Sequence, residues 1–364
     1  MNTQSLRQKN SIAAALQPFI DNYSLAGAVT LVATKDKILD VTTVGFADVV
    51  AQKPMQPDSL FWIASMTKPM TGAAVMMLVD EGRVSMADPV EKYLPEFKGQ
   101  MVIAEQDEQN VLLKRPAHPI TLGNVLSHTS GLPFNSRVEF PTADGLPLRT
   151  AVLSYAMMPL QQEPDTKYVY CNAGINIAAR VLEVVTGQSY EKFLAQRILK
   201  PLGMTETSFW PNALLLKRLA KSYKPNATKT GFEETGIAQL QTPYSSRRRY
   251  PLPAGGLFST ARDVVRFGQM ILNGGTLDGR RYLSDAAVRE MTRRQTAPQL
   301  SEGYGFGWQA GEGWSGHGGA LATKFTIHWQ VGLVTVLLVQ YLGPWDDSLK
   351  FREAFEQAAL QLKD

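Results

Sequence analysis

Residues 61–82 read FWIASMTKPMTGAAVMMLVDEG, and they place Ser65 three positions before Lys68, with Pro69 directly after the lysine. After the serine, apolar residues recur every three or four positions, which is the pattern of a buried helix, and Gly82 is a natural stop. Proline is tolerated in the first turn of a helix, because the N–H groups there have no acceptor within the helix. We therefore predict a buried helix that begins near Ser65 and carries Ser65 and Lys68 on one face.

A serine beside a buried lysine can act as a nucleophile. The hydroxyl reacts once a base removes its proton, and burial lowers the pKa of a lysine towards the range in which it can be that base. Ser-x-x-Lys is weak evidence alone, since it occurs again at Ser189 and Lys192, where a helix-capping serine explains it. For Ser65 the alternative is likewise a capping serine with a lysine that reaches solvent.

A second segment with candidate site residues lies directly before a predicted helix at 173–187. In the functional interpretation the phenol of Tyr170 relays a proton, and the amide of Asn172 orients the lysine or the substrate. In the structural interpretation Asn172 caps the helix and Tyr170 is an ordinary aromatic residue.

A third segment, His317-Gly318-Gly319, stands at the entry to a predicted strand. An exposed glycine turn would explain it, but glycines also let an edge strand pass very close to a bound ligand. In that case the backbone N–H groups of Ser65 and Ala320 would together form an oxyanion hole.

The three motifs Ser65-x-x-Lys68, Tyr170-x-Asn172 and His317-x-Gly319 resemble the signature motifs of the serine β-lactamase and penicillin-binding protein family, in order and in spacing. The chain looks most similar to class C β-lactamases, serine DD-peptidases and the carboxylesterases that share their fold. The similarity covers most of the chain, through segments 63–97, 120–132, 198–209, 254–275 and 304–308.

This resemblance implies acyl transfer to Ser65, with Lys68 and Tyr170 sharing the role of base, followed by hydrolysis of the acyl-enzyme. Asn172, His317, Gly318 and Gly319 are then the candidate substrate-binding residues.

One position departs from the family pattern, because penicillinases usually carry lysine where this chain has His317. An imidazole holds a substrate carboxylate less well than a permanent charge does. Small esters are therefore the expected substrates of a serine hydrolase. A β-lactamase, DD-peptidase or D-amino-acid peptidase is the alternative, and a non-catalytic binding protein of the same fold is the third interpretation.

Short β-branched segments lie near both ends of the chain. A hairpin is predicted from 27–34 and 38–47, and three further strands from 304–309, 323–330 and 333–342. Helices are predicted at both termini, over 1–23 and over 346–362, the latter capped by Asp346 or Asp347, and the middle of the chain is mostly helical.

Residues 1–60 and 300–364 are therefore predicted to form one sheet domain, and 61–299 a mostly helical insertion that carries the first two motifs. The resemblance implies an α+β fold (an α/β sandwich), with an antiparallel sheet of about five strands flanked by helices and the site between the two parts. Segments 139–162 and 234–256 are expected to shape the pocket, with Phe134, Tyr244 and Trp314 as candidate walls.

Charge and composition exclude several other classes of function. The net charge is only +4, and we interpret the basic run Arg247–Arg249 as a solvated loop, so no nucleic-acid partner is expected. Cys171 is the only cysteine, which rules out a disulfide within the chain. No metal or other cofactor is expected, since the four histidines have no metal-ligand spacing: His118, His128, His317 and His328. His128 is tempting as the base of a triad, but we interpret it as part of a helix end.

The longest apolar run starts at Val331 and has about half the length of a membrane span, so it is predicted to be a buried strand. The first 23 residues lack the apolar core of a signal peptide. The sequence as given predicts a cytoplasmic protein, or a periplasmic or secreted one if an export signal was removed. Oligomeric state is left open.

Overall fold

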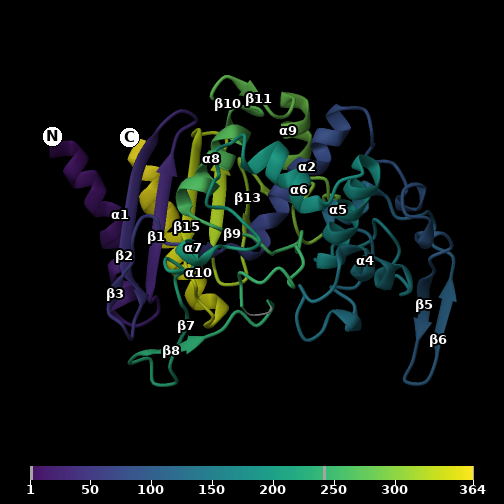
Figure 1. Cartoon of the computed structure of the whole chain (residues 1–364), viewed down its shortest axis with the longest axis horizontal. Coiled ribbons are helices and arrows are strands. Elements are labelled where there is room, and N and C mark those ends of the chain that lie inside the picture. The colour runs from purple at the N-terminus through teal and green to yellow at the C-terminus, as the bar shows by residue number, and fades with distance from the viewer. Residues whose placement is uncertain (1–2, 241–242, 364) are drawn as a thin grey trace.

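The computed structural model describes residues 3–240 and 243–363. Its centre is a seven-stranded antiparallel sheet in the order β12-β13-β14-β15-β1-β2-β3, in which purple N-terminal strands lie beside yellow C-terminal strands (Figure 1). The strands are β1 (Gly27–Ala33), β2 (Ile38–Asp48), β3 (Lys53–Pro54), β12 (Gln309–Gly311), β13 (Trp314–Gly318), β14 (Lys324–His328) and β15 (Leu333–Leu338). Five longer strands with a short one at each edge confirm the predicted fold class.

The two ends of the chain meet where β1 pairs with β15, from Val29 opposite Leu338 to Ala33 opposite Val334. Every residue of both strands is buried, because helices cover both faces of the sheet. On one face, α1 (Thr3–Asp21) packs against α10 (Trp345–Leu360). On the other face, α8 (Ala261–Leu272) packs against β1 and β15.

A helical region lies beside the sheet (Figure 1), with the buried helix α2 (Thr67–Asp80) in its interior. A 3-10 turn over Ala64–Met66 leads into α2, and Pro69 is the third residue of the helix, as predicted. The other helices of this region are α3 (Leu122–Ser127), α4 (Leu148–Ala156), α5 (Asn172–Thr186), α6 (Tyr190–Leu194), α7 (Ala213–Leu216) and α9 (Asp285–Thr292).

Four small two-stranded sheets complete the described structure. They pair β4 (Phe61–Trp62) with β9 (Phe258–Ser259), β5 (Val102–Gln106) with β6 (Val111–Lys114), β7 (Ser222–Pro225) with β8 (Phe232–Thr235), and β10 (Thr276–Leu277) with β11 (Arg280–Arg281). No helix within residues 3–240 and 243–363 has both the length and the hydropathy to cross a membrane.

Several predicted boundaries need correction. The predicted strand at 304–309 is wrong except at its ends, where Tyr304 and Gln309 form an isolated bridge, because the glycines between them let the segment bend back, with Gly307 at φ +82°. His317 lies near the end of β13, a strand that was not predicted. α10 begins at Trp345 after Pro344, so Asp346 lies in the first turn and not at the cap.

The remaining helix limits agree more closely with prediction. α1 covers the predicted N-terminal helix from Thr3, while residues 1 and 2 lie outside the described residues. The helix predicted at 173–187 is α5, which ends at Gly187 as expected, and α3 is capped by Thr121. Ser189 precedes α6 as expected, although its hydroxyl bonds Glu191 and does not cap the helix. The predicted division into two parts at residues 60 and 300 stays a prediction.

Candidate active site

Ser65 lies in the 3-10 turn that precedes α2, where the backbone is constrained. Ala64 has φ +47°, a left-handed conformation that costs energy for any residue with a side chain. The loop after β13 packs directly against this turn, since a Cβ on Gly319 would lie 2.7 Å from the Ile63 carbonyl oxygen. Glycine at 319 therefore allows the third motif to reach the nucleophile turn.

The ammonium nitrogen of Lys68 joins two of the predicted motifs. Its Nζ lies 3.0 Å from Ser65 Oγ, 2.9 Å from Asn172 Oδ1 and 2.6 Å from the Ala254 carbonyl oxygen. The side chain is fully buried, and this burial lowers the Lys68 pKa to about 7. A neutral amine has two N–H groups and one lone pair. It can therefore donate to Asn172 and Ala254 while its lone pair accepts the Ser65 proton.

The side chain of Tyr170 lies beside Lys68 and Ser65. Lys68 Nζ lies 4.7 Å from the centre of its ring. Burial raises the pKa of Tyr170 far above its usual value, and a hydrogen bond with Ser65 offsets part of that effect. The phenol thus stays protonated at neutral pH, so it can pass a proton on but cannot serve as a standing phenolate base.

His317 is locked as a neutral ring. Its Nδ1 lies 2.6 Å from the Gly318 carbonyl oxygen, which can only accept, so Nδ1 carries the proton. Its Nε2 lies 2.8 Å from the Tyr304 hydroxyl, which therefore donates to it. Burial, and secondly the charge of Lys68, lower the pKa of His317 well below its usual value. Both ring nitrogens are thus used within the protein.

The strand that carries His317 is unpaired with β12 at its end, although His317 itself is buried. β12 pairs with β13 only from Trp314 to Gly316, so residues 317 and 318 have no neighbouring strand on that side. β12 and not β13 is the edge strand of the sheet, so the expected passage of this segment beside a ligand stays a prediction.

A cavity of about 340 Å³ opens beside Ser65, and the expected segments 139–162 and 234–256 both contribute to it, residues 241 and 242 lying outside the described structure. Its lining residues are Trp62, Ala64, Ser65, Phe134, Asn135, Glu139, Phe140, Pro141, Ala143, Asn172, Ala238, Gln239, Leu252, Ala254, Gly255 and Ala320. No lysine or arginine is among these described residues. Apart from Ser65, Glu139 is the only residue among these described lining residues whose side chain can ionise. Burial raises the pKa of the Glu139 carboxyl.

The cavity also contains two free backbone donors. Ser65 and Ala320 both line it, and neither N–H has a hydrogen-bond acceptor within the described ranges of the chain. These two groups are available to bind the oxygen of a substrate carbonyl, as an oxyanion hole requires.

Of the candidate walls, only Phe134 lines this cavity. Tyr244 is half-buried and packs against Phe258, and Trp314 lines a separate hollow with Trp329. The expectation of a solvated basic run is wrong for Arg249, which is buried and paired with Asp144.

Two residues that contact the motifs were missed by the sequence analysis. They are Ala254, whose carbonyl receives Lys68, and Tyr304, whose hydroxyl holds His317. Both lie in segments of family similarity, which was the one available signal. Within the described residues, no group of three or more His, Cys, Asp or Glu side chains could hold a metal ion.

Comparison with known proteins identifies the family and the fold. The sequence model of the family called Beta-lactamase matches residues 12–359. The chain is 32% identical over 282 residues to penicillin-binding protein 4 of Amycolatopsis lactamdurans, covering 74% of this chain and 68% of that protein. It is 30% identical over 327 residues to esterase EstB of Burkholderia gladioli, covering 82% and 79%. The solved structure of EstCE1, a hydrolase with promiscuous acyltransferase activity, matches with a TM-score of 0.80 at 22% identity, over 97% of this chain and 100% of that one.

Proposed function

The chain belongs to the Beta-lactamase family, and from that premise we propose that it is a serine hydrolase that forms an acyl-enzyme on Ser65 and acts best on small esters. The observation that carries the proposal is the surroundings of Lys68 Nζ. Two acceptors, Asn172 Oδ1 and the Ala254 carbonyl oxygen, take its N–H groups, and Ser65 Oγ lies 3.0 Å away at the remaining position. That arrangement suits a neutral lysine that removes the serine proton.

The proposed reaction proceeds in two steps. The substrate carbonyl oxygen binds the N–H groups of Ser65 and Ala320, Lys68 takes the proton of Ser65, and Oγ forms a bond to the carbonyl carbon. When the bond to the leaving alcohol breaks, Tyr170 passes the proton from Lys68 to that alcohol. A water molecule then attacks the ester on Ser65, with the same groups removing its proton and returning one to Oγ.

Two observations support uncharged esters over β-lactams, which carry a carboxylate. His317 is neutral and both its nitrogens are engaged, and no lysine or arginine is among the described residues that line the cavity. A substrate carboxylate would thus lose its hydration without gaining a cationic partner. The similarity to a protein named esterase EstB supports the same choice.

The alternative substrate class is a β-lactam or a D-amino-acid peptide. It is supported by the 32% identity to a protein named penicillin-binding protein 4. The chemistry at Ser65 would be the same, and only the leaving group would differ. A non-catalytic binding protein is the less favoured third possibility, because all three motifs are complete.

Comparison of p-nitrophenyl acetate, p-nitrophenyl butyrate and nitrocefin, with Ser65→Ala as control, tests the proposal. We expect kcat/KM for the esters to exceed that for nitrocefin, and a fluorophosphonate probe to label Ser65 in the native protein alone. Faster turnover of nitrocefin would replace the ester proposal with the alternative. Folded native protein that neither turns over any substrate nor takes up the probe would refute the serine hydrolase.

A further inference from the structure

We propose that His128 is the residue that positions Tyr170 for proton transfer, through a hydrogen bond from a backbone N–H to its ring nitrogen Nδ1. This inference rests on the proposed function and assigns a role to a residue outside the three motifs. His128 does not line the cavity and has no hydrogen bond to Ser65 or Lys68 within the described residues.

His128 holds the chain on both sides of Tyr170. Its carbonyl oxygen accepts the N–H of Val169 at 2.9 Å, and its Nδ1 accepts the N–H of Cys171 at 3.2 Å. Its ring also packs on the ring of Tyr170, with the centres 4.5 Å apart. One residue thus fixes the backbone before and after the phenol as well as the face of the phenol ring.

The protonation of His128 suits this role and excludes that of a base. Because Nδ1 accepts a backbone N–H, the ring proton is on Nε2, which has no hydrogen-bond partner among the described residues. Burial, and secondly the charge of Lys68, lower the pKa of His128 well below its usual value. A neutral acceptor at Nδ1 is therefore present at neutral pH.

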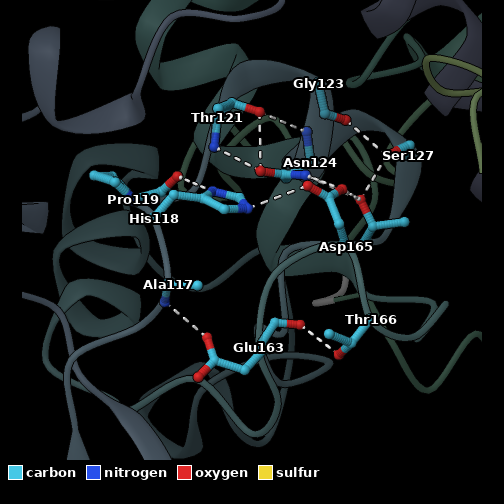
Figure 2. Close-up of polar contacts among 11 residues, drawn as sticks. Ala117, His118, Pro119, Thr121, Gly123, Asn124, Ser127, Glu163, Asp165 and Thr166 are labelled. Atoms are coloured by element: carbon cyan, nitrogen blue, oxygen red, sulfur yellow. Dashed lines mark hydrogen bonds and ion pairs between the residues drawn. The ribbon is translucent and has the colours of Figure 1, made fainter.

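A polar network at the end of α3, on both sides of residue 128 in the chain, joins Asn124 and Thr129 to Asp165 (Figure 2). Asp165 Oδ1 accepts from Asn124 Nδ2 and Thr129 Oγ1, and the N–H of Asp165 donates to the Thr129 carbonyl oxygen at 2.9 Å. Thr121 caps α3 by a reciprocal pair of hydrogen bonds with Asn124. The end of α3 and the segment leading to Tyr170 are thereby joined at two successive places, first at 129 and 165 and then at His128.

The backbone of His128 narrows the choice of replacements. It has φ +61°, and among residues with side chains asparagine adopts this left-handed conformation most readily. The amide oxygen of asparagine can also occupy the position of Nδ1. Phenylalanine keeps an aromatic ring but leaves the buried N–H of Cys171 without its acceptor, and glutamine places its amide near the position of Nε2 instead.

The experiment measures the rate constant of Ser65 acylation by p-nitrophenyl acetate in the burst phase. This rate constant is a property of each active site, so it does not change if a variant contains a smaller fraction of folded protein. We expect His128→Phe and His128→Gln to acylate about 10²-fold more slowly than the native protein, since a displacement of about 1 Å can cost that much, with KM unchanged. His128→Asn should restore most of the lost rate. His328→Asn, the same change at a histidine on β14 whose ring contacts Thr335 and Glu356, is the matched control and should match the native protein.

Three results would overturn the inference. Equal losses in His128→Asn and His128→Phe would mean that the ring itself, or a base at this position, matters more than the acceptor. If folded His128→Phe and His128→Gln are acylated at the native rate, then His128 does not position Tyr170 for the reaction and serves the fold alone. A rise in KM with an unchanged burst rate would place its effect on binding. If the native protein itself is never acylated, the proposed function fails first, and that result is seen without any variant.

Discussion

At the scale of single residues, Lys68 links activity to pH. Burial lowers its pKa to about 7, and only the neutral amine can accept the proton of Ser65. The neutral fraction grows as pH rises through the folded pKa, so kcat/KM for p-nitrophenyl acetate should increase with pH up to about 7 and then level off. A pH profile measured from 5 to about 10, within the stable range of the protein, checks this. An increase that continues to pH 10 would show that Lys68 keeps an ordinary pKa.

Removal of the proposed base or relay should be severe while leaving the fold intact. Lys68→Ala should lower the burst rate of acylation by about 10²–10⁴-fold, the usual worth of base assistance. Tyr170→Phe should also reduce it strongly, since the phenol stays protonated and passes a proton to the leaving alcohol. Burst kinetics with thermal unfolding as a control measure both. An undiminished burst in either variant would contradict the assigned roles.

The sequence allowed part of this site to be predicted. Ser65 lies in the 3-10 turn that leads into α2 and Lys68 in the first turn of that helix, so the predicted helical spacing was enough to place them together. Ala254 and Tyr304 could not be identified, because a backbone carbonyl and a distant hydroxyl become partners only when the tertiary fold is known. The neutral state of His317 likewise depends on its two partners in space.

At the scale of elements, Gly72 keeps α2 close to the segment that holds Tyr304. A Cβ on Gly72 would lie 2.2 Å from the Phe306 carbonyl oxygen. Alanine gains up to about 1 kcal/mol in helix propensity, but overpacking of a rigid contact costs about 1–3 kcal/mol. Gly72→Ala should therefore lower the free energy of unfolding, as measured with denaturant.

Gly123→Ala in α3 is the matched control, because its added methyl would lie 3.2 Å from the Met86 carbonyl oxygen and should cost less. If Gly72→Ala proves as stable as the native protein, α2 and the Phe306 segment are free to separate, and the argument from close contact fails.

A buried ion pair joins segments 139–162 and 234–256, which both line the cavity. Arg249 Nε lies 2.5 Å from Asp144 Oδ2, with side-chain exposures of 2% and 0%, and the N–H of Tyr250 donates to the Asp144 carbonyl oxygen. Arg249→Met leaves the carboxylate buried without its cation, which should cost about 3–5 kcal/mol in the free energy of unfolding. Adding Asp144→Asn should recover part of that loss, and the double-mutant cycle measures it. A double variant no more stable than Arg249→Met would refute the pairing.

Strands and helices with clear sequence signals could be predicted, whereas the glycine-rich turns at 304–308 could not. The hairpin of β1 and β2 follows from its short β-branched segments, and the helix α5, with its stop at Gly187, follows from helical spacing and a stop signal. The segment 304–308 has the composition of a strand, yet its glycines let it fold into turns against α2, a contact that local sequence does not reveal.

At the scale of the whole molecule, the sheet depends on two segments whose paired residues, from Ala33 opposite Val334 to Val29 opposite Leu338, lie more than 300 positions apart in the chain. β1 lies between β2 and β15, and the apolar cluster under α1 and α10 takes residues from both ends. Neither end has enough strands to bury both of its faces alone, since an isolated hairpin is only marginally stable. The nucleophile turn depends on this assembly too, because Gly319, just after β13, packs on Ile63.

A chain that ends at residue 300 lacks β12 to β15 and α10, and it should therefore lose both its cooperative fold and its site. β1 would have no partner on one edge, the apolar side of α1 would have no α10 to pack against, and Ser65 would have no Ala320 beside it. We expect thermal unfolding of this fragment, followed by circular dichroism, to show no cooperative transition, and we expect no fluorophosphonate labelling of Ser65. A chain ending at residue 360 keeps all these strands and helices and is the control. A fragment of 300 residues that unfolds cooperatively and labels at Ser65 would show that the helical region folds and builds the site by itself.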